Sequence, residues 1–280
     1  MSWYPADVAW SYRQLRDGGM TRTDIENALA TGRLFRARRN VYLAGDTADD
    51  LKSAARVGGR LDCLSALRVM GVFVQEHEQL HVQIEANRKH LRSPRSRRVR
   101  LKDRHGVRVH WRRVQAPDDV LVVDPVEALI LASRCQPPRS MIATLDSALH
   151  QGIVTSEDLD DVFAALPGHF GVLRRLVDSR AESGPESLAR LELRGAGWHV
   201  AVQQWIDGVG RADLVVERRV IVECDSREHH SGWEAQERDR ARDLAAAERG
   251  FATVRPTARM IFDDVGDIRR AVAGLLAAPF

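Results

Sequence analysis

The stretch RADLVVERRVIVECD, residues 211–225, decides the architecture of the C-terminal part of this chain. Residues 212–216 and 219–224 are rich in β-branched and other apolar side chains, which is typical of buried strands. A short polar turn joins them, so the stretch predicts a hairpin. Asp213 lies in the first strand and Glu223 near the end of the second. The hairpin would let these two carboxylates project together.

The two carboxylates need a partner, because burying an unpaired acid beside β-branched residues costs free energy unless it is paired or binds a metal. Two or three carboxylates on one site commonly hold Mg²⁺ and leave positions open for water and phosphate. We therefore expect Asp213 and Glu223 to be ligands of Mg²⁺ or Mn²⁺. The alternative is a structural salt bridge with Arg211 or Arg227.

The segments around the hairpin alternate between helical and strand patterns. In chain order they predict a helix at 186–194, a strand at 200–205, the hairpin, a helix at 233–249, a strand at 251–255 and a helix from 263. This order indicates an α/β domain. A domain boundary is expected between Ala181 and Pro185, where the preceding helical pattern ends.

Four ordered motifs in this region resemble a known family. They are ESLARLELRGAGW, VQQWIDGVGRADLVV, RVIVECDSREHH and ERDRARDLAAAERGFATVRPT. Together they resemble the domain of unknown function related to very-short-patch-repair endonucleases, within the PD-(D/E)XK nuclease superfamily. The resemblance implies a restriction-endonuclease-like core over residues 181–280, with a mixed central sheet flanked by helices. It also implies metal-dependent cleavage of DNA.

The resemblance further implies which side chains form the catalytic site. Glu186 matches the acid on the first core helix, and Gln203 matches a polar position on the strand that follows. Asp213 and Glu223 match the metal ligands. Asp225 stands where the superfamily has lysine, and it is a candidate supplementary acid.

Two further groups of residues are implied after the third strand. His229 or His230 matches a histidine that assists the chemistry, since an imidazole that titrates near neutral pH can act as a general acid or base. Arg238, Asp239 and Arg242 match a charged stripe on the next helix. This stripe would brace the acids or contact DNA.

Residues 1–45 predict a winged helix-turn-helix domain that binds DNA. Helices at 6–16 and 24–30 precede a hairpin with a basic turn, and a short helix with a basic wing suits the major groove and backbone phosphates. The segment GGMTRTDIENALATGRLFRARRNVYLA is similar to the winged-helix domain of AbiEi-type antitoxins. The alternative is a protein-binding helical hairpin. The candidate DNA contacts are Arg22, Arg33, Arg36, Arg38 and Arg39.

Residues 46–180 predict a basic, mixed α/β and helical middle region. Strands are expected at 80–84 and 107–111, with helices before and after them, the last three spanning 141–150, 156–165 and 170–179. Between residues 88 and 113, twelve arginines and lysines accompany a single acid, Asp103. Such a block faces either solvent or a polyanion. We favour the DNA backbone, with Arg97 and Arg98 as contacts, over a solvated sheet edge.

Composition limits the class of protein. The net charge is only +3, yet all but three of the 42 basic residues are arginine, which favours bidentate phosphate contacts but also fits the codon usage of a GC-rich genome. The cysteines Cys63, Cys135 and Cys224 form no C-x-x-C pair, so we expect reduced thiols and no disulfide framework or cysteine-rich zinc site. No apolar run is long enough to cross a membrane, and no secretory signal is visible, so a cytoplasmic location is expected.

Two functions follow from these features. The first is a DNA-binding, metal-dependent endonuclease in DNA repair or phage defence. The second is a non-catalytic DNA-binding regulator that resembles the antitoxin of a type IV toxin-antitoxin system, with a decayed nuclease domain. Asp225 and Ser226 depart from the superfamily and family patterns and leave room for the second function. DNA is the expected partner, with a cognate toxin or a second copy of the chain as further candidates.

Overall fold

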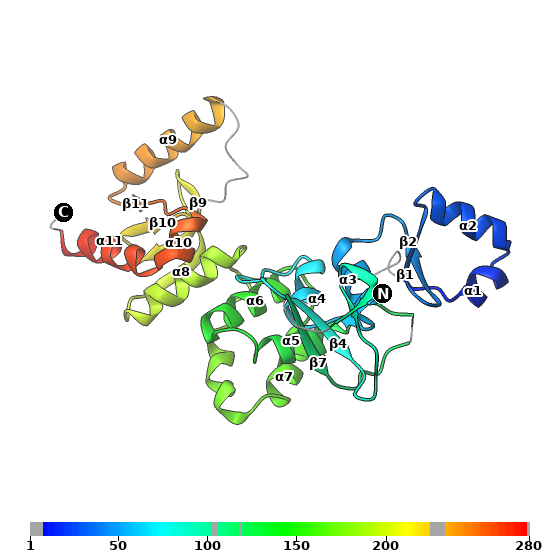
Figure 1. Cartoon of the computed structure of the whole chain (residues 1–280). Helices are drawn as coiled ribbons and strands as arrows, with labels where there is room; N and C mark the ends of the chain where they lie inside the picture. Colours follow the sequence, from blue (N-terminus) through cyan, green and yellow to red (C-terminus); the bar gives the residue numbers. More distant parts are fainter. Residues whose placement is uncertain (1–7, 102–105, 118, 225–232, 279–280) are drawn as a thin grey trace. The chain divides into compact units, whose positions relative to one another are not determined.

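The chain folds into two compact units, each of which is described here by itself (Figure 1). The computed structural model describes residues 8–101, 106–117, 119–224 and 233–278, and only the backbone of 234–236. Unit 1 comprises Met1–Gly71 and Glu76–Cys135, and unit 2 comprises Val72–Gln75 and Gln136–Phe280. With 45% helix and 21% strand in several sheets, the structure confirms the predicted α/β content, α+β overall.

Unit 1 contains five helices and seven strands among its described residues. Its helices are α1 (Tyr12–Asp17), α2 (Arg22–Ala30), α3 (Asp49–Val57), α4 (Cys63–Val69) and α5 (Pro125–Ala132). Its strands are β1 (Leu34–Arg38), β2 (Val41–Ala44), β3 (Arg60–Leu61), β4 (Leu80–Ile84), β5 (Arg92–Ser93), β6 (Ser96–Arg100) and β7 (Val107–Trp111). The strands expected at 80–84 and 107–111 are both present.

The N-terminal elements follow the predicted order of helix, helix and hairpin. Ser11 and Thr21 cap α1 and α2, each in a capping box with the residue three positions on. Leu15, Ile25 and Tyr42 form a small core between the two helices and the β1–β2 hairpin. The first helix begins six residues later than expected, at Tyr12, because Ser11 starts it and the preceding residues pair as isolated β-bridges instead.

The middle of unit 1 is built on a three-stranded sheet in the order β3-β4-β7. The central strand β4 pairs antiparallel with β3 and parallel with β7, and all five of its side chains are buried. The basic segment between β4 and β7 forms a separate antiparallel hairpin, β5–β6. Four of the five residues of β6 are exposed, as its arginine content requires.

Unit 2 contains six α-helices, one 3₁₀ helix and four strands among its described residues. The helices are α6 (Pro138–His150), α7 (Ser156–Ala164), η1 (Gly168–Leu176), α8 (Gly184–Gly195), α9 (Trp233–Glu248), α10 (Ala258–Asp264) and α11 (Gly266–Ala277). The strands are β8 (Val200–Ile206), β9 (Gly210–Val216), β10 (Val220–Val222) and β11 (Ala252–Val254). The helix expected at 170–179 is instead the 3₁₀ segment η1. No helix in the described part of the chain is both long enough and apolar enough to span a membrane.

The sheet of unit 2 is mixed, with the strand order β11-β10-β9-β8. The strands β8, β9 and β10 form an antiparallel meander, whereas β10 and β11 are parallel. Parallel neighbours need a crossover connection, and α9 supplies it. The sequence of elements from α8 to β11 is therefore helix, three strands, helix and strand, as the sequence predicts.

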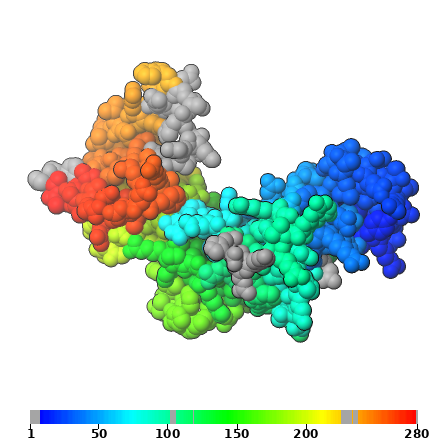
Figure 2. Space-filling view, viewed as in Figure 1, coloured from blue at the N-terminus to red at the C-terminus, as the bar shows by residue number. Residues whose placement is uncertain are grey.

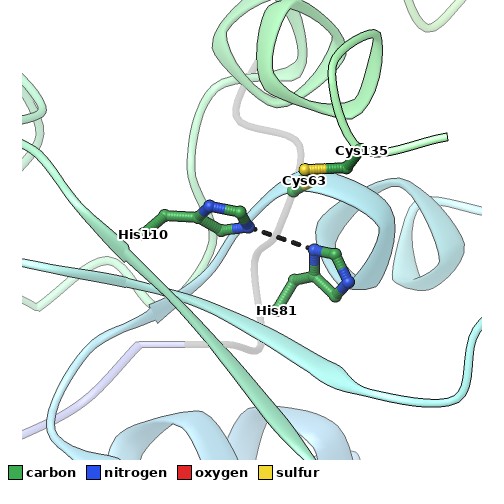
Figure 3. Close-up of side chains that lie close together, drawn as sticks. All are labelled: Cys63, His81, His110 and Cys135. Atoms are coloured by element: carbon green, nitrogen blue, oxygen red, sulfur yellow. Dashed lines mark hydrogen bonds between the residues drawn. The ribbon is translucent and has the colours of Figure 1, made fainter.

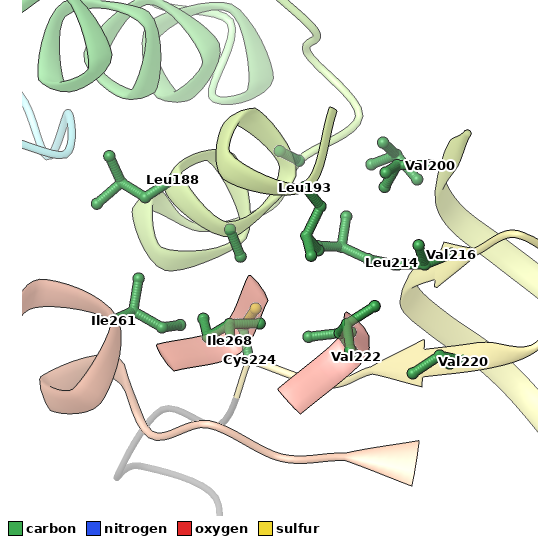
Figure 4. Packing of buried hydrophobic residues seen from close by; sticks show 14 of the residues in the cluster. Leu188, Leu193, Val200, Leu214, Val216, Val220, Val222, Cys224, Ile261 and Ile268 are labelled. Atoms are coloured by element: carbon green, nitrogen blue, oxygen red, sulfur yellow. The ribbon is translucent and has the colours of Figure 1, made fainter. Parts of the chain in front are cut away.

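Both faces of this sheet are buried. The larger core lies between the sheet and the helices α8, α10 and α11, and it includes Leu188, Leu214, Val222 and Ile268 (Figure 4). The smaller core lies under α9, where Ala246 joins a second set of sheet residues that includes Val215 and Ile221. Alternate residues of β9 thus enter opposite cores, which is why the hairpin reads as almost continuously apolar.

The boundaries of the units differ from the boundaries expected at 45/46 and 180/181. Within residues 46–180, the part up to Cys135 belongs to unit 1 apart from residues 72–75, and the part from Gln136 belongs to unit 2. The physical reason is that α6 packs on α8, with the buried ion pair Arg190–Asp146 between them at 2.6 Å. Helices that the sequence assigned to the middle region therefore complete the fold of unit 2.

Candidate functional site

Asp213 and Glu223 meet at the end of the β9–β10 pair. Val222 is paired with Leu214, so the register brings the next residue, Glu223, beside Asp213. The Oδ2 atom of Asp213 accepts a hydrogen bond of 2.9 Å from the backbone N–H of Cys224. The two acids that the sequence predicts to act together are thus neighbours.

Glu186 and Gln203 belong to the same cluster, which we call the acidic cluster (Glu186, Gln203, Asp213 and Glu223). The Nε2 atom of Gln203 donates to Glu186 Oε2 at 2.8 Å and to Asp213 Oδ1 at 3.3 Å. Gln203 has a φ of 51°, a left-handed conformation that costs a non-glycine residue on the order of 1 kcal/mol. Its side-chain Oε1 atom is buried and has no hydrogen-bond partner among the described residues.

Burial and mutual repulsion oppose the ionisation of the three carboxyl groups in the acidic cluster. Burial, followed by repulsion from Asp213, raises the pKa of Glu223 to about 7. The same two causes raise the pKa of Glu186, and burial is the main cause of the raised pKa of Asp213. Three carboxyl groups that resist ionisation together would be stabilised by protons or by a cation.

Arg242 holds the cluster from α9. Its guanidinium donates to the backbone oxygens of Val209 at 3.1 Å and Arg211 at 2.8 Å, and to Glu223 Oε1 at 3.1 Å. Of the two roles expected of the charged stripe, bracing the acids and contacting DNA, these three bonds fit the first for Arg242. Arg238, one turn earlier on α9, is exposed.

The acidic cluster has the donors that a hard divalent cation requires. Its carboxylate oxygens and the unpartnered amide oxygen of Gln203 are the ligand types that Mg²⁺ and Mn²⁺ prefer. Among the described residues, its acids do not form a group whose oxygens all lie within 4.8 Å of one another. The expected participants Asp225, His229 and His230 lie outside the described residues.

A basic groove of about 550 Å³ lies in unit 1, where the β1–β2 hairpin meets the basic segment. Five of the arginines expected to contact DNA line it. Its lining residues are Arg36, Arg38, Arg39, Arg88, His90, Arg92, Arg97 and Arg98. Figure 2 shows turquoise atoms, the colour of residues near 100 in the bar, at the surface of the face in view. Residues more than fifty positions apart in sequence thus present one cationic surface.

Among the described residues, no acid forms an ion pair with the arginines that line the basic groove. Burial and the neighbouring charge of Arg88 lower the pKa of Arg38 to about 10. The Nε atom of Arg36 is buried and finds no hydrogen-bond partner in the described part of the chain. Arg22, which the sequence assigned to the same interface, does not line the groove and pairs instead with Glu26 at 2.9 Å. An external polyanion would satisfy these groups.

A second group of ligand side chains lies in unit 1, and it was not expected from the sequence. Cys63, His81, His110 and Cys135 have ligand atoms that all lie within 4.8 Å of one another, so they could hold a metal ion (Figure 3). Burial, followed by a hydrogen bond between the two thiols, raises the pKa of Cys63, and the same hydrogen bond lowers the pKa of Cys135. No local spacing signals this group, because each residue comes from a different element.

Comparison of the chain with models of known protein families and with curated proteins finds no match.

Proposed function

We propose that this protein is a DNA-binding, metal-dependent endonuclease that hydrolyses phosphodiester bonds. The observation that carries the proposal is the acidic cluster, in which one buried and two half-buried carboxyl groups with raised pKa values gather beside a glutamine in a strained conformation. The cluster draws its residues from α8, β8, β9 and the end of β10, within a domain whose order of helix, three strands, helix and strand is the one expected of a restriction-endonuclease-like core. Neighbouring carboxyl groups whose pKa values are raised by burial and by one another are typical of functional sites.

Asp213 and Glu223 would hold the metal, and Glu186 would be a supplementary acid. Bound there, Mg²⁺ or Mn²⁺ would polarise a phosphoryl oxygen and lower the pKa of a water molecule. Gln203 orients Asp213 and Glu186 through its Nε2 atom. Arg242 orients Glu223 from α9. His229 or His230 would act on a proton or a phosphate oxygen, and Asp225 would supplement the acids.

The basic groove supports DNA as the substrate. It gathers seven arginines and one histidine in one hollow, and guanidinium groups match phosphate oxygens in bidentate geometry. An interface of this composition positions a duplex through its backbone and carries little sequence information. The proposed division of labour is therefore a phosphate-binding unit 1 and a cleaving unit 2.

The test is cleavage of supercoiled plasmid and of short labelled DNA in Mg²⁺ or Mn²⁺. We expect the parent to cut and Asp213→Ala to lose more than 99% of the activity while binding the same DNA equally well. The matched control is Asp263→Ala, which removes an exposed acid of unit 2 and should leave cleavage unchanged. Equal cleavage by the parent and Asp213→Ala would refute the site.

A non-catalytic regulator is the second candidate, and one observation favours it. The basic groove lies wholly in unit 1, so phosphate binding does not require the acidic cluster. Salt-dependent binding to duplex DNA by both proteins, with no cleavage of duplex, mismatched or single-stranded DNA by either, would establish this function. An antitoxin-like repressor with a cognate toxin would then be the model to test.

A further inference from the structure

The four ligand side chains in unit 1 are brought together by four separate elements. Cys63 begins α4, His81 lies on β4, His110 lies on β7, and Cys135 follows α5. Because β4 and β7 are parallel neighbours, with His81 opposite Arg108 and His110 opposite Gln83, the two histidines sit diagonally on adjacent strands. The helices α4 and α5 pack against each other and bring the two sulfur atoms to the same place.

The positions of the ligand atoms match a tetrahedral metal ion. The distance between His81 Nδ1 and His110 Nε2 is 3.1 Å (Figure 3). In a tetrahedral zinc site with two sulfur and two nitrogen ligands, neighbouring ligand atoms are separated by roughly 3.3–3.8 Å, as the Zn–S and Zn–N bond lengths require. Ligand atoms that all lie within 4.8 Å of one another therefore need only small side-chain movements to enclose an ion.

We propose that Cys63, His81, His110 and Cys135 form a structural zinc site in unit 1. Two thiols and two imidazoles select zinc over magnesium or calcium, which prefer oxygen ligands. On binding, the two thiols release two protons, and the two thiolates then balance the charge of Zn²⁺. Four protein ligands leave no position for water or substrate, so the ion is structural rather than catalytic.

The burial of the group suits a permanent ion. Cys63 is fully buried and His81 is only 5% exposed, while His110 and Cys135 are half-buried. Cys63 also has a φ of 54°. Residues other than glycine rarely adopt this left-handed backbone conformation, and it is often found at functional positions. Asp62, the neighbour that caps α4, is itself held by two hydrogen bonds of 2.9 Å from Arg112.

The site would fasten the ends of the basic segment. His81 and His110 flank residues 82–109, which carry five of the eight side chains that line the basic groove. Through the ion, Cys63 and Cys135 would connect β4 and β7 to the helices α4 and α5. Zinc would thus hold the sheet and its helices in one arrangement, and this role does not depend on whether unit 2 cleaves DNA.

The test is the zinc content of the full-length protein, purified with a thiol reductant and measured by mass spectrometry of the metal. We expect about one zinc per chain in the parent and less than a tenth of that in Cys135→Ala and His110→Ala. Cys224→Ala, which removes the buried cysteine of unit 2, is the matched control and should keep its zinc. Full zinc retention in Cys135→Ala would refute the assignment.

A second measurement on the unmodified chain guards against variants that do not fold. The protein is stripped of metal and titrated with Co²⁺ alone. We expect saturation at one equivalent, with intense d–d absorption of tetrahedral cobalt, a thiolate-to-cobalt charge-transfer band, and displacement of Co²⁺ by Zn²⁺. Absence of these bands, or a resting protein in which Cys63 and Cys135 are joined by a disulfide, would overturn the proposal.

Discussion

The surroundings of Glu223 oppose the ionisation of its carboxyl group. It lies between Asp213, which repels its charged form, and Arg242, which attracts it, and burial prevails to raise its pKa to about 7. The side chain is only 13% exposed, so water does little to relieve the conflict. When it is ionised, Glu223 therefore lowers the free energy of unfolding of the metal-free protein.

The replacement Glu223→Gln is expected to stabilise the metal-free protein at high pH. The folded pKa of about 7 exceeds the ordinary value of 4.5, so the folded state binds the proton more tightly than the unfolded state. The contribution of Glu223 to the free energy of unfolding therefore falls as pH rises from about 4.5 through 7. At pH 8 the variant should be more stable by about 2–3 kcal/mol, and the difference should shrink towards pH 4.5.

Urea unfolding at pH 5 and pH 8, without added Mg²⁺ or Mn²⁺, measures this difference. The control is Glu248→Gln, which neutralises an exposed acid of α9 whose side chain is 79% exposed. It should change the free energy of unfolding little at either pH. An equal effect of Glu223→Gln at both pH values would contradict the raised pKa.

At the scale of elements, α6 and α8 are joined by a buried ion pair. The side chains of Asp146 and Arg190 are both fully buried, and Ser187 donates a further hydrogen bond of 2.7 Å to Asp146. Arg190 also donates to the backbone oxygen of Leu176 at 2.8 Å, at the end of η1. One guanidinium thus connects three helical elements, which explains why they belong to the same unit.

Removing one member of this pair should be costly. Asp146→Ala leaves the guanidinium of Arg190 buried without its counter-ion, and we expect a loss of about 3–5 kcal/mol in the free energy of unfolding. The measurement is denaturant unfolding of the full chain. The comparison is Asp263→Ala, which breaks an exposed pair with Arg259 on α10 and should cost less than about 1 kcal/mol. Similar losses in the two variants would show that the pair contributes no more than a surface pair.

At the scale of the whole molecule, the basic groove depends on two segments that are far apart in sequence. The β1–β2 hairpin supplies Arg36, Arg38 and Arg39, and the segment around β5 and β6 supplies the rest. Each segment alone is a strip of solvated charge. Together they concentrate positive potential in a hollow, which attracts a polyanion more strongly than a flat surface does.

If arginines of the groove contact phosphates, the affinity for DNA should depend on the salt concentration through them. Replacing Arg97 or Arg98 by alanine should weaken binding to duplex DNA of any sequence and lower the slope of log K against log salt by about 1 each. Arg175→Ala removes the same charge from an exposed position in unit 2 and should leave the slope unchanged. Titrations by fluorescence anisotropy at several salt concentrations decide this. An equal effect of all three replacements would mean that net charge matters and the groove does not.

The sequence allowed the elements of unit 2 to be predicted because their signals are local. Runs of β-branched and other apolar residues mark β9 and β10, and the acids within these strands point to a cluster at their ends. Glu186 and Gln203 came from a resemblance, and the structure brings both to Asp213. The division into units could not be predicted, because it depends on which helix packs on which.

The amino-acid sequence by itself determined the α/β content, the order of strands in the C-terminal hairpin and the gathering of acids there, since neighbours in the chain suffice for these. Only the tertiary structure decided the group formed by Cys63, His81, His110 and Cys135. Their sequence separations carry no signal, and the ligand atoms meet because β4 pairs in parallel with β7 while α4 packs on α5. The tertiary structure also decided the position of Arg242. Which face of α9 meets the acidic cluster depends on how the helix packs on the sheet.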